Sequence, residues 1–331
     1  MARAPWPPRF RRIPADDWVS APPETLALKY DTVQDHGWYR NLDRTVRDVV
    51  AAMEPGALLL DYSGGTGILA ERLLAELPDL ELGIVIVDAS PKFLRVALDK
   101  LGGDERVAFR LIRYLKQERR LETLQEVVGE PLLERGVDVL TSTNAIHLYY
   151  DLEETLRSWH DLLVPDGPAF VQSGNIGVAE LPEDAWIIDE TVDAINDAAV
   201  ALVREDDRYA DYRDALADPA RVAAYEQLRR KFFLPVRPLE HYVRALTGAG
   251  FRIRDVSHVE IEARTDEWGE FLAAYHEGVL GWVGGSERIE GVPPDEAAVA
   301  ERLTLLRESV ARVFGGPTFS AVWTYIDAVG G

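Results

Sequence analysis

The residues best suited to do chemistry lie where one apolar run gives way to another, in "LLLDYSGGTGILAERLL" at positions 58–74. Asp61 is followed by a group of small residues around Thr66, and apolar residues resume at helical spacing from Ile68. A glycine turn after a buried strand lets a ligand lie against bare backbone, and the amides that open the next helix face that ligand. The stretch therefore predicts a ligand site with a carboxylate at its edge.

Two ligands fit such a turn. "GTGILA", residues 65–70, matches the G-x-G-x-x-G/A fingerprint of dinucleotide-binding proteins. S-adenosylmethionine is the other candidate, and Asp61 separates the two, because a carboxylate there would repel a pyrophosphate but would suit the ammonium group of a methionine moiety. Asp88, at the end of the next apolar run, is the acid expected to accept hydrogen bonds from ribose hydroxyls. Both ligands need that acid, so it indicates an adenosine site without choosing between them.

The elements that position these residues alternate along the chain. Buried strands are expected over 57–62, 82–88, 107–112, 137–142 and 168–173. Helices are expected over 42–53, 67–77, 90–101, 151–163 and 237–250, with a helical connection around 116–128. A sixth strand is expected over 251–263 and a last one over 319–329. This alternation indicates an α/β protein with a doubly wound parallel sheet.

Helical segments interrupt the pattern twice. We divide the chain into an N-terminal arm and lid segment, a core in two pieces, and two helical insertions, at residues 1–41, 42–177 with 237–331, 178–236 and 264–315. Both insertions begin or end at the ligand edge of the sheet, so we expect them to form a lid over an acceptor substrate. An enclosed site suits a small molecule better than a protein or a transfer RNA.

Composition limits the partners and the chemistry. The 331 residues carry a formal charge of −21, which argues against nucleic acid as a partner. The chain has no cysteine, which excludes thiolate chemistry, and no run long enough to span a membrane. The arginine-rich first twelve residues predict a flexible arm and a cytoplasmic protein. Acidic residues outnumber arginines between residues 180 and 218. This segment is interpreted either as a solvated helical face or as an electrostatic funnel for a cationic substrate.

Three longer stretches together resemble the class I, Rossmann-like S-adenosylmethionine-dependent methyltransferases. They are "LLLDYSGGTGILAERLL", "IVIVDASPKFLRVA" and "VDVLTSTNAIHLYYDLEETLRSWHDLLVPDGPAFVQS". The resemblance covers residues 40–175, and "HYVRALTGAGFRIRDV" continues it. It implies a seven-stranded sheet of six parallel strands and an antiparallel last strand, for which "FSAVWTYIDAV" stands in the right place. It also implies S-adenosyl-L-methionine as cofactor and S-adenosylhomocysteine as product.

The resemblance also implies roles for individual residues. The methionine part of the cofactor would be held by Asp61, Ser63, Gly64, Gly65 and Gly67. The ribose and adenine would be held by Asp88, Ala89, Arg113 and Tyr114, with Tyr30 over the cofactor and Asn144 near the methyl-donating sulfur. Two positions depart from the family pattern: serine replaces glycine at Ser63, and Arg113 and Tyr114 stand where the family often has an adenine-binding Gly-Asp-Ala.

Methyl transfer from a sulfonium needs a base only when the nucleophile must lose a proton. His147, just past the fourth strand, is the best candidate, with Tyr149 and His36 as further catalytic candidates; a structural role for His147 is the competing interpretation. No metal site emerges. The sequence thus predicts a methyltransferase for a small-molecule acceptor. Its composition and its expected helical lid suit an enzyme of specialised metabolism. A nicotinamide-dependent oxidoreductase and a non-catalytic S-adenosylmethionine-binding protein are the alternatives, and the helical insertions leave a homodimer open.

Overall fold

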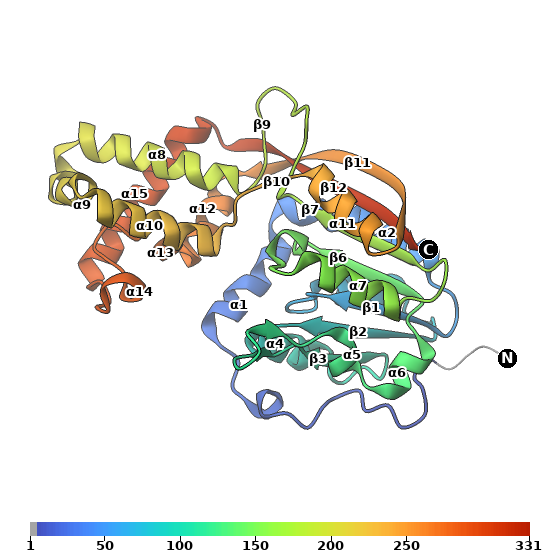
Figure 1. Ribbon diagram of the computed structural model, residues 1–331. Helices are drawn as coiled ribbons and strands as arrows, with labels where there is room; N and C mark the ends of the chain where they lie inside the picture. Colours follow the sequence, from blue (N-terminus) through green and yellow to red (C-terminus); the bar gives the residue numbers. More distant parts are fainter. Residues whose placement is uncertain (1–4) are drawn as a thin grey trace.

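A twisted sheet forms the centre of the computed structural model, which describes residues 5–331 (Figure 1). The strand order is β11-β12-β7-β6-β1-β2-β3. The strands with parallel neighbours are β1 (Ala57–Tyr62), β2 (Leu82–Asp88), β3 (Val107–Leu111), β6 (Val139–Thr143) and β7 (Pro168–Ser173). β12 (Thr318–Gly330) lies antiparallel between β7 and β11 (Phe251–Arg264). The predicted sheet of six parallel strands and one antiparallel last strand is confirmed.

Helices cover both faces of this sheet, so its central strands are apolar on both sides. One face carries α2 (Leu42–Ala52), α3 (Ile68–Glu76) and α4 (Pro91–Leu101). The other carries α5 (Leu124–Val128), α6 (Glu130–Arg135), α7 (Leu152–Leu162) and α11 (Leu239–Gly248). Local sequence fixes where they begin: the hydroxyl of Ser90 accepts a hydrogen bond from the Phe93 amide, and the side chain of Asp151 accepts one from Glu154.

Seven helices form a second body, which we call the helical lobe (Figure 1). They are α8 (Glu190–Glu205), α9 (Arg213–Ala217), α10 (Pro219–Phe232), α12 (Thr265–Ala274), α13 (His276–Leu280), α14 (Glu287–Glu290) and α15 (Glu296–Phe314). The first three enter the chain between β7 and α11, and the other four enter between β11 and β12. β12 pairs with β7 only from Thr324 onward, whereas its pairing with β11 extends back to Thr318. The β11–β12 ribbon therefore projects beyond the sheet and carries the lobe.

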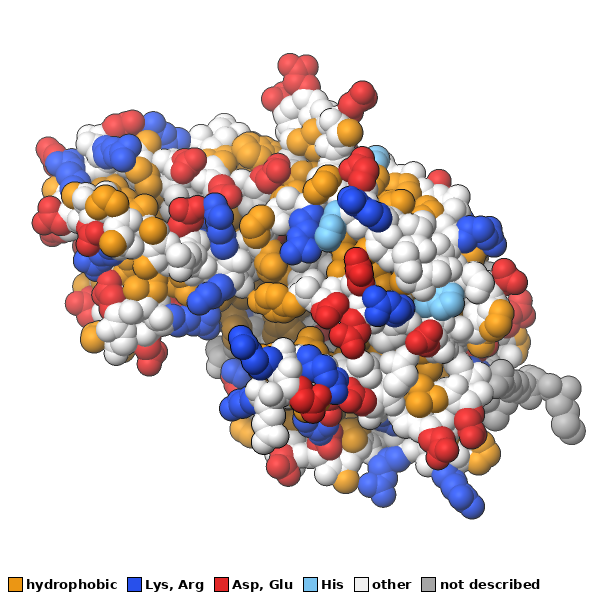
Figure 2. Space-filling model, viewed as in Figure 1, with side chains coloured by type: hydrophobic (Ala, Val, Ile, Leu, Met, Phe, Trp, Pro, Cys, Tyr) orange, Lys and Arg blue, Asp and Glu red, His pale blue; other side chains and the backbone are white. Residues whose placement is uncertain are grey.

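Hydrogen bonds and ion pairs join the two insertions within the lobe. The indole nitrogens of Trp268 and Trp282 donate to α8, to the Thr191 hydroxyl at 3.0 Å and the Asn196 amide oxygen at 3.1 Å. Three ion pairs join the first insertion to the second. They are Glu205–Arg312, Arg208–Glu308 and Arg221–Glu290. Acidic and basic side chains intermingle over the lobe in Figure 2. This arrangement favours a solvated face over a funnel for cations.

The N-terminal segment is not a flexible arm over its described part, so that prediction is wrong for residues 5–12. The Phe109 amide of β3 donates to the Arg12 carbonyl at 3.0 Å, and the Arg12 guanidinium donates to the Val107 carbonyl at 2.8 Å. The Trp6 indole donates to the Glu105 carbonyl at 2.9 Å. β3 is the edge strand, and the segment pairs backbone groups that would otherwise be exposed there. Residues 1–4 lie outside the described part of the chain.

The helical connection expected around 116–128 is wrong in its first half. Residues 114–121 form a hairpin of β4 (Tyr114–Leu115) and β5 (Arg120–Leu121). Arg119 takes a left-handed φ of 57° in the turn, a conformation that charge composition alone does not reveal. The helix begins only at Leu124, where Thr123 and Glu126 form a capping box.

The other short elements lie at the edges of the sheet and the lobe. They are α1 (Thr25–Asp31), η1 (Asp17–Ser20), η2 (Thr32–Asp35), η3 (Gly37–Asn41), η4 (Ile146–Leu148), η5 (Asp207–Tyr212), β8 (Ile176–Gly177), β9 (Ala185–Trp186) and β10 (Arg237–Pro238). β9 adds two residues of parallel pairing to β12, which the sequence pattern of the first insertion did not indicate. Across residues 5–331, no helix combines the length and apolar character that a membrane crossing requires.

Candidate functional site

The glycine turn joins β1 to α3 and has an unusual backbone. Ser63, Gly65 and Gly67 have positive φ values of 60°, 56° and 80°. A Cβ at Gly64 would lie 2.5 Å from Asp61 Oδ2, and one at Gly67 would lie 2.9 Å from a methyl group of Leu101. Glycine at both positions therefore lets the turn close over the Asp61 carboxylate and against α4.

The Asp61 carboxylate is buried and only half satisfied. Thr141 Oγ1 donates to Asp61 Oδ1 at 3.0 Å, whereas Oδ2 has no hydrogen-bond partner among the described residues. Burial raises the pKa of Asp61 to about 7, since no cation compensates for the lost hydration. A buried acceptor with no partner is costly to keep, so the geometry suits a ligand that brings a donor or a positive charge to Oδ2.

Asp88 holds the turn from the end of the neighbouring strand. Its Oδ2 accepts a hydrogen bond from the Gly65 amide at 2.9 Å, and its Oδ1 accepts one from the Ser90 amide at 2.7 Å. Burial raises the pKa of Asp88 to about 6 although these amides oppose the rise. Each oxygen keeps further accepting capacity, which is what vicinal ribose hydroxyls would use. Ala89 follows directly, two residues before α4 begins.

Tyr149 lies behind the turn instead of beside the reacting groups. Asp61 and Leu59 share the sheet face that α2 to α4 cover, because side chains alternate along a strand. Tyr149 packs edge-on against Tyr62 on the opposite face. Its hydroxyl donates to Ser63 Oγ at 3.1 Å and lies 2.8 Å from Ser142 Oγ. These contacts favour a role in positioning Ser63 over the catalytic role predicted for Tyr149.

His147 is also unsuited to the role of a base. The Asp189 amide donates to Asn175 Oδ1 at 2.8 Å, which turns the NH₂ of Asn175 toward His147 Nε2 at 3.1 Å. Nδ1 then carries the proton and faces Ser173 Oγ at 3.0 Å. Burial lowers the pKa of His147 to about 3. With both nitrogens engaged and low basicity, this ring joins η4 to the end of β7, which favours the structural interpretation of His147 over the predicted general base.

Asn144 lies where the chain leaves β6, in a left-handed conformation with φ of 54°. Its Oδ1 accepts hydrogen bonds from Trp323 Nε1 at 2.9 Å and from Asn41 Nδ2 at 3.2 Å. Sequence reasoning did not single out Asn41 or Trp323, nor Gln172, whose carbonyl pairs with the Asn144 amide. The sequence signal that could have pointed to Gln172 is the presence of a glutamine inside the buried run "PAFVQS".

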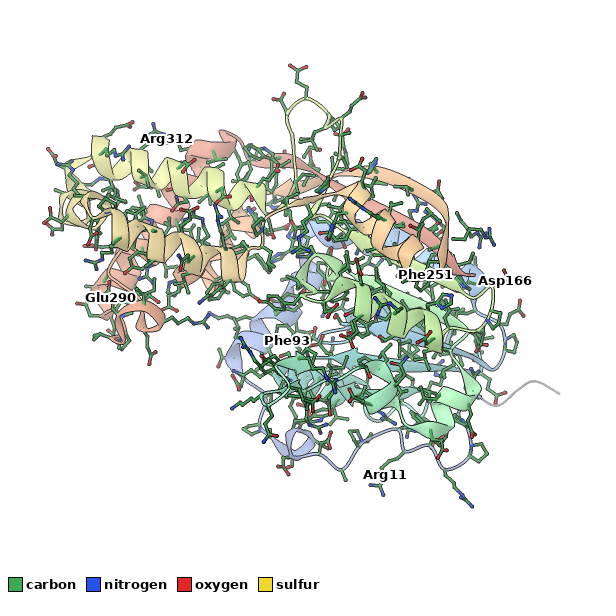
Figure 3. The ribbon with its side chains drawn as sticks, viewed as in Figure 1. Arg11, Phe93, Asp166, Phe251, Glu290 and Arg312 are labelled. Atoms are coloured by element: carbon green, nitrogen blue, oxygen red, sulfur yellow. The ribbon has the colours of Figure 1, made fainter. Side chains whose placement is uncertain are left out.

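Aromatic rings cover the turn from the N-terminal side. Tyr30 stacks on Phe93 with ring centroids 4.9 Å apart, and Phe93 lies beside Gly65. Figure 3 labels Phe93 near the start of α4, close to α1. Burial raises the pKa of Tyr30, and its hydroxyl pairs with that of Tyr39. The structure thus brings Tyr30 to the glycine turn.

A cavity of about 230 Å³ lies between α1 and α12. Its apolar walls include Tyr30, Val33, Phe271 and Tyr275, and His36 lies at its lining with a buried Nδ1 that lacks a partner among the described residues. The cavity therefore shares Tyr30 with the ring stack on the turn.

Arg113 and Tyr114 are directed away from the turn. The Arg113 guanidinium pairs with Asp16 at 2.7 Å and with Glu122 at 3.6 Å, and 57% of Tyr114 is exposed in the β4–β5 hairpin. The backbone just before them does contact the site, because the Ile112 amide donates to the Asp88 carbonyl at 2.9 Å. Within residues 5–331 no group of three or more acidic or histidine side chains is arranged to hold a metal ion.

Comparison with known proteins adds the deciding observation. A family model described as a methyltransferase domain matches residues 60–169, from the end of β1 into β7. The matched stretch contains the glycine turn, Asp88 and Asn144, and the sheet places antiparallel β12 between β7 and β11. Residues 60–169 therefore form a methyltransferase domain, and the sheet that contains it has the class I, Rossmann-like strand order. The predicted family, enzyme class and cofactor are thereby confirmed, and the nicotinamide alternative is set aside.

Relatives of this methyltransferase are distant. A segment of 114 residues, 34% of the chain, is 28% identical to the hybrid PKS-NRPS synthetase apdA of Emericella nidulans, of which it spans 3%. The YcgJ protein of Bacillus subtilis is 14% identical over 88% of the chain and 98% of its own, with a TM-score of 0.48. Phosphoethanolamine N-methyltransferase 2 of Haemonchus contortus, bound to phosphomonomethylethanolamine and S-adenosylhomocysteine, is 15% identical over 92% of the chain and 56% of its own, with a TM-score of 0.47. None of these similarities bears on the acceptor of this methyltransferase.

The residues of this methyltransferase fit its cofactor. Asp61 Oδ2 is a buried acceptor without a partner among the described residues. The ammonium group of the methionine part of S-adenosylmethionine is a cation that could donate a hydrogen bond to it. Asp88 retains the acceptor capacity that ribose needs, beside a turn with no side chain at Gly64 or Gly65.

Proposed function

We propose that this methyltransferase acts on a small-molecule acceptor that binds between the N-terminal segment of α1 and η2 and the helical lobe. The observation that carries the proposal is the cavity of about 230 Å³ between α1 and α12, whose wall at Tyr30 also covers the glycine turn. This volume suits a compound of one or two rings. The domain boundaries given above, with the lobe as a lid, are part of the same proposal.

The donor side of the proposal assigns residues to parts of S-adenosylmethionine. Asp61 would pair with the ammonium group and Asp88 with the ribose hydroxyls, while the backbone of Ser63 to Gly67 would face the methionine part. Asn144 would lie near the sulfur. When bound, the cofactor supplies a methyl group on a positively charged sulfur, which needs no further activation.

The protein would accelerate the transfer mainly by holding the acceptor in line with the methyl group. Positioning of this kind can supply roughly 7–11 kcal/mol of a barrier. A base is not part of the proposal, because His147 is neutral, fully paired and of low basicity. His36 remains a candidate contact for the acceptor, since its Nδ1 is buried without a partner among the described residues and its ring lies at the cavity.

The test supplies S-adenosylmethionine labelled in its methyl group together with separate small-molecule, protein and RNA fractions of a cell extract. We expect label to enter the small-molecule fraction. Ala274→Trp, which fills the cavity, should abolish labelling but leave the affinity for S-adenosylhomocysteine intact. Ala51→Trp, on the exposed side of α2, is the matched control and should change neither. Label confined to protein or RNA would contradict the proposal, and binding without any transfer would support the non-catalytic alternative.

Three further expectations belong to this proposal. They are a cytoplasmic location, no nucleic-acid partner, and a role in specialised metabolism; a homodimer also stays a prediction. The charge of −21 supports the second, because a phosphate backbone needs a basic surface.

A further inference from the structure

Asn41 and Asn144 are hydrogen-bonded through their side chains, and the backbone amide of Asn144 donates to the backbone carbonyl of Gln172; we call these three residues the amide cluster. Asn41 and Gln172 have no exposed surface. Asn144 Oδ1 accepts from both Asn41 and Trp323. In contrast, Asn41 Oδ1 and both polar atoms of the Gln172 amide have no hydrogen-bond partner within residues 5–331.

Such unpaired groups are uncommon in a folded interior. Buried polar side chains are nearly always hydrogen-bonded, and an unpaired one costs the free energy of its lost hydration. Gln172 is the fifth residue of the six-residue strand β7, at a buried position where an apolar residue would pack without that cost. A glutamine at this position, next to a second unpaired amide oxygen, indicates that a ligand pairs with these atoms.

The cluster lies on the acceptor side of the donor site. In register, Gln172 stands beside Thr143 of β6 and Tyr325 of β12, on the sheet face that Asp61 also faces. Two strand spacings, about 10 Å, separate β7 from β1. The strand order places Asn144 between the glycine turn and Gln172. Gln172 is thus farther from the turn than Asn144, on the side of Trp323.

A chain of aromatic rings connects the cluster to the cavity. Trp323 stacks on Trp38 with centroids 6.0 Å apart, and Trp38 meets Phe271 edge-on at 6.0 Å. Phe271 lines the cavity. The Trp38 indole nitrogen is itself buried without a partner among the described residues. Trp38 and Trp323 thus lie between the cavity and the cluster, so an acceptor that reached the unpaired amides from the cavity would lie among flat apolar rings.

The chemistry of these groups selects against charge. The amide cluster carries no formal charge, and the ion pair nearest in register, Arg44 with Asp327, is already satisfied internally at 3.6 Å. Asp61 is committed to the cofactor under the proposed function. A buried ammonium or carboxylate on the acceptor would thus lack a counter-charge here, whereas a hydroxyl both donates and accepts, as the Gln172 amide does.

We propose that Gln172 and Asn41 determine acceptor specificity, and that the acceptor is an uncharged planar ring compound with a hydroxyl group that these amides bind. This inference rests on the proposed function and names its substrate class. The hydroxyl is the group recognised, and the proposal does not require it to be the atom that receives the methyl group.

The test measures binding by calorimetry to protein saturated with S-adenosylhomocysteine. Three probes share one ring system and differ in charge: 2-naphthylmethanol, 2-naphthylmethylamine and 2-naphthoate. We expect the alcohol to bind at least about tenfold more tightly than either charged probe. Gln172→Leu should reduce the affinity for the alcohol about tenfold while leaving the affinity for S-adenosylhomocysteine unchanged. Gln125→Leu is the matched control, because that glutamine already donates to the Ser158 carbonyl in the α5–α7 layer.

Each other outcome has a distinct meaning. Equal or tighter binding of a charged probe, or no binding of any probe to the saturated protein, overturns this inference alone. A loss of S-adenosylhomocysteine affinity in Gln172→Leu also overturns it, by assigning the cluster to the cofactor. Failure of the wild-type protein to bind S-adenosylhomocysteine would instead refute the donor site on which the proposed function rests.

Discussion

Asp61→Asn removes a charge from the donor site while nearly preserving the shape of the side chain. The carboxylate is buried, Oδ2 is unpaired, and burial raises its pKa from 3.8 to about 7. Each pKa unit is worth about 1.4 kcal/mol, so this rise corresponds to roughly 4 kcal/mol. Because the folded pKa is above the unfolded one, the stability that Asp61 contributes is present below about pH 4 and lost as the pH rises through about 7.

The free protein should therefore gain stability from Asp61→Asn at pH 8 and gain nothing at pH 4. The gain should be about 1–3 kcal/mol, less than the full value, because the asparagine amide remains partly unpaired. Affinity for S-adenosylhomocysteine should move in the opposite direction. A charge-assisted hydrogen bond is worth about 1.5–3 kcal/mol, so its loss should weaken binding about 10- to 150-fold.

The pH dependence of binding provides an independent check. In the wild type, Asp61 must lose its proton before it can pair with an ammonium group, so affinity should fall as the pH decreases below about 7. Asp61→Asn should lose this dependence and keep only the fall below about pH 6 that Asp88 contributes. Calorimetry at several pH values, together with thermal unfolding of the free protein, measures both effects.

Asp327→Asn is the matched control for this experiment. Asp327 lies in the same row of the sheet as Asp61, three strands away, and pairs with Arg44. Its replacement should leave the affinity for S-adenosylhomocysteine unchanged. If Asp61→Asn binds S-adenosylhomocysteine as tightly as the wild type at pH 8, the reasoning from the unpaired oxygen is refuted.

Three further predictions concern the same region. Asp88→Ala should weaken S-adenosylhomocysteine binding by roughly 1–3 kcal/mol in calorimetry, and an unchanged affinity would exclude the ribose role. His147 should stay neutral in an NMR titration from pH 8 to pH 5, because its pKa is lowered to about 3; a transition near the ordinary value of 6.5 would restore it as a candidate base. Gly67→Ala should reduce the free energy of unfolding by about 1–3 kcal/mol, since φ is 80° and Leu101 lies close. Gly103→Ala, with open space around it, is the control for denaturant unfolding, and equal losses in both variants would contradict the backbone argument.

Local sequence was sufficient for the elements and for the donor half of the site. Continuous apolar runs predict the buried strands, and cap residues such as Ser90 predict where helices begin. Asp61 and Gly67 lie close together in the sequence, so one local motif predicts both the turn and its carboxylate. Asp88 follows because parallel strands end at the same edge of a sheet.

Other features could not be predicted from the sequence, because they depend on contacts between distant residues or on burial and hydrogen bonding that a residue's type does not reveal. Arg12 pairs with β3 across nearly a hundred residues, and no local pattern announces an edge strand. His147 has the residue type of a base, but its neighbours at Ser173 and Asn175 remove the accessible nitrogen and the basicity. Chemistry read from a side chain alone omits burial and hydrogen bonding, which here decide the role.

The sequence by itself determined that this protein is an α/β methyltransferase with a carboxylate and a glycine turn for its donor, since those signals are local and repeat the geometry of strands and helices. Only the tertiary structure decided the acceptor side. Asn41, Gln172 and Trp323 come from three separate parts of the chain, and two insertions fold into one lobe that places Phe271 against Trp38, which stacks on Trp323. Long-range packing sets those contacts, so no spacing of residues could have predicted them.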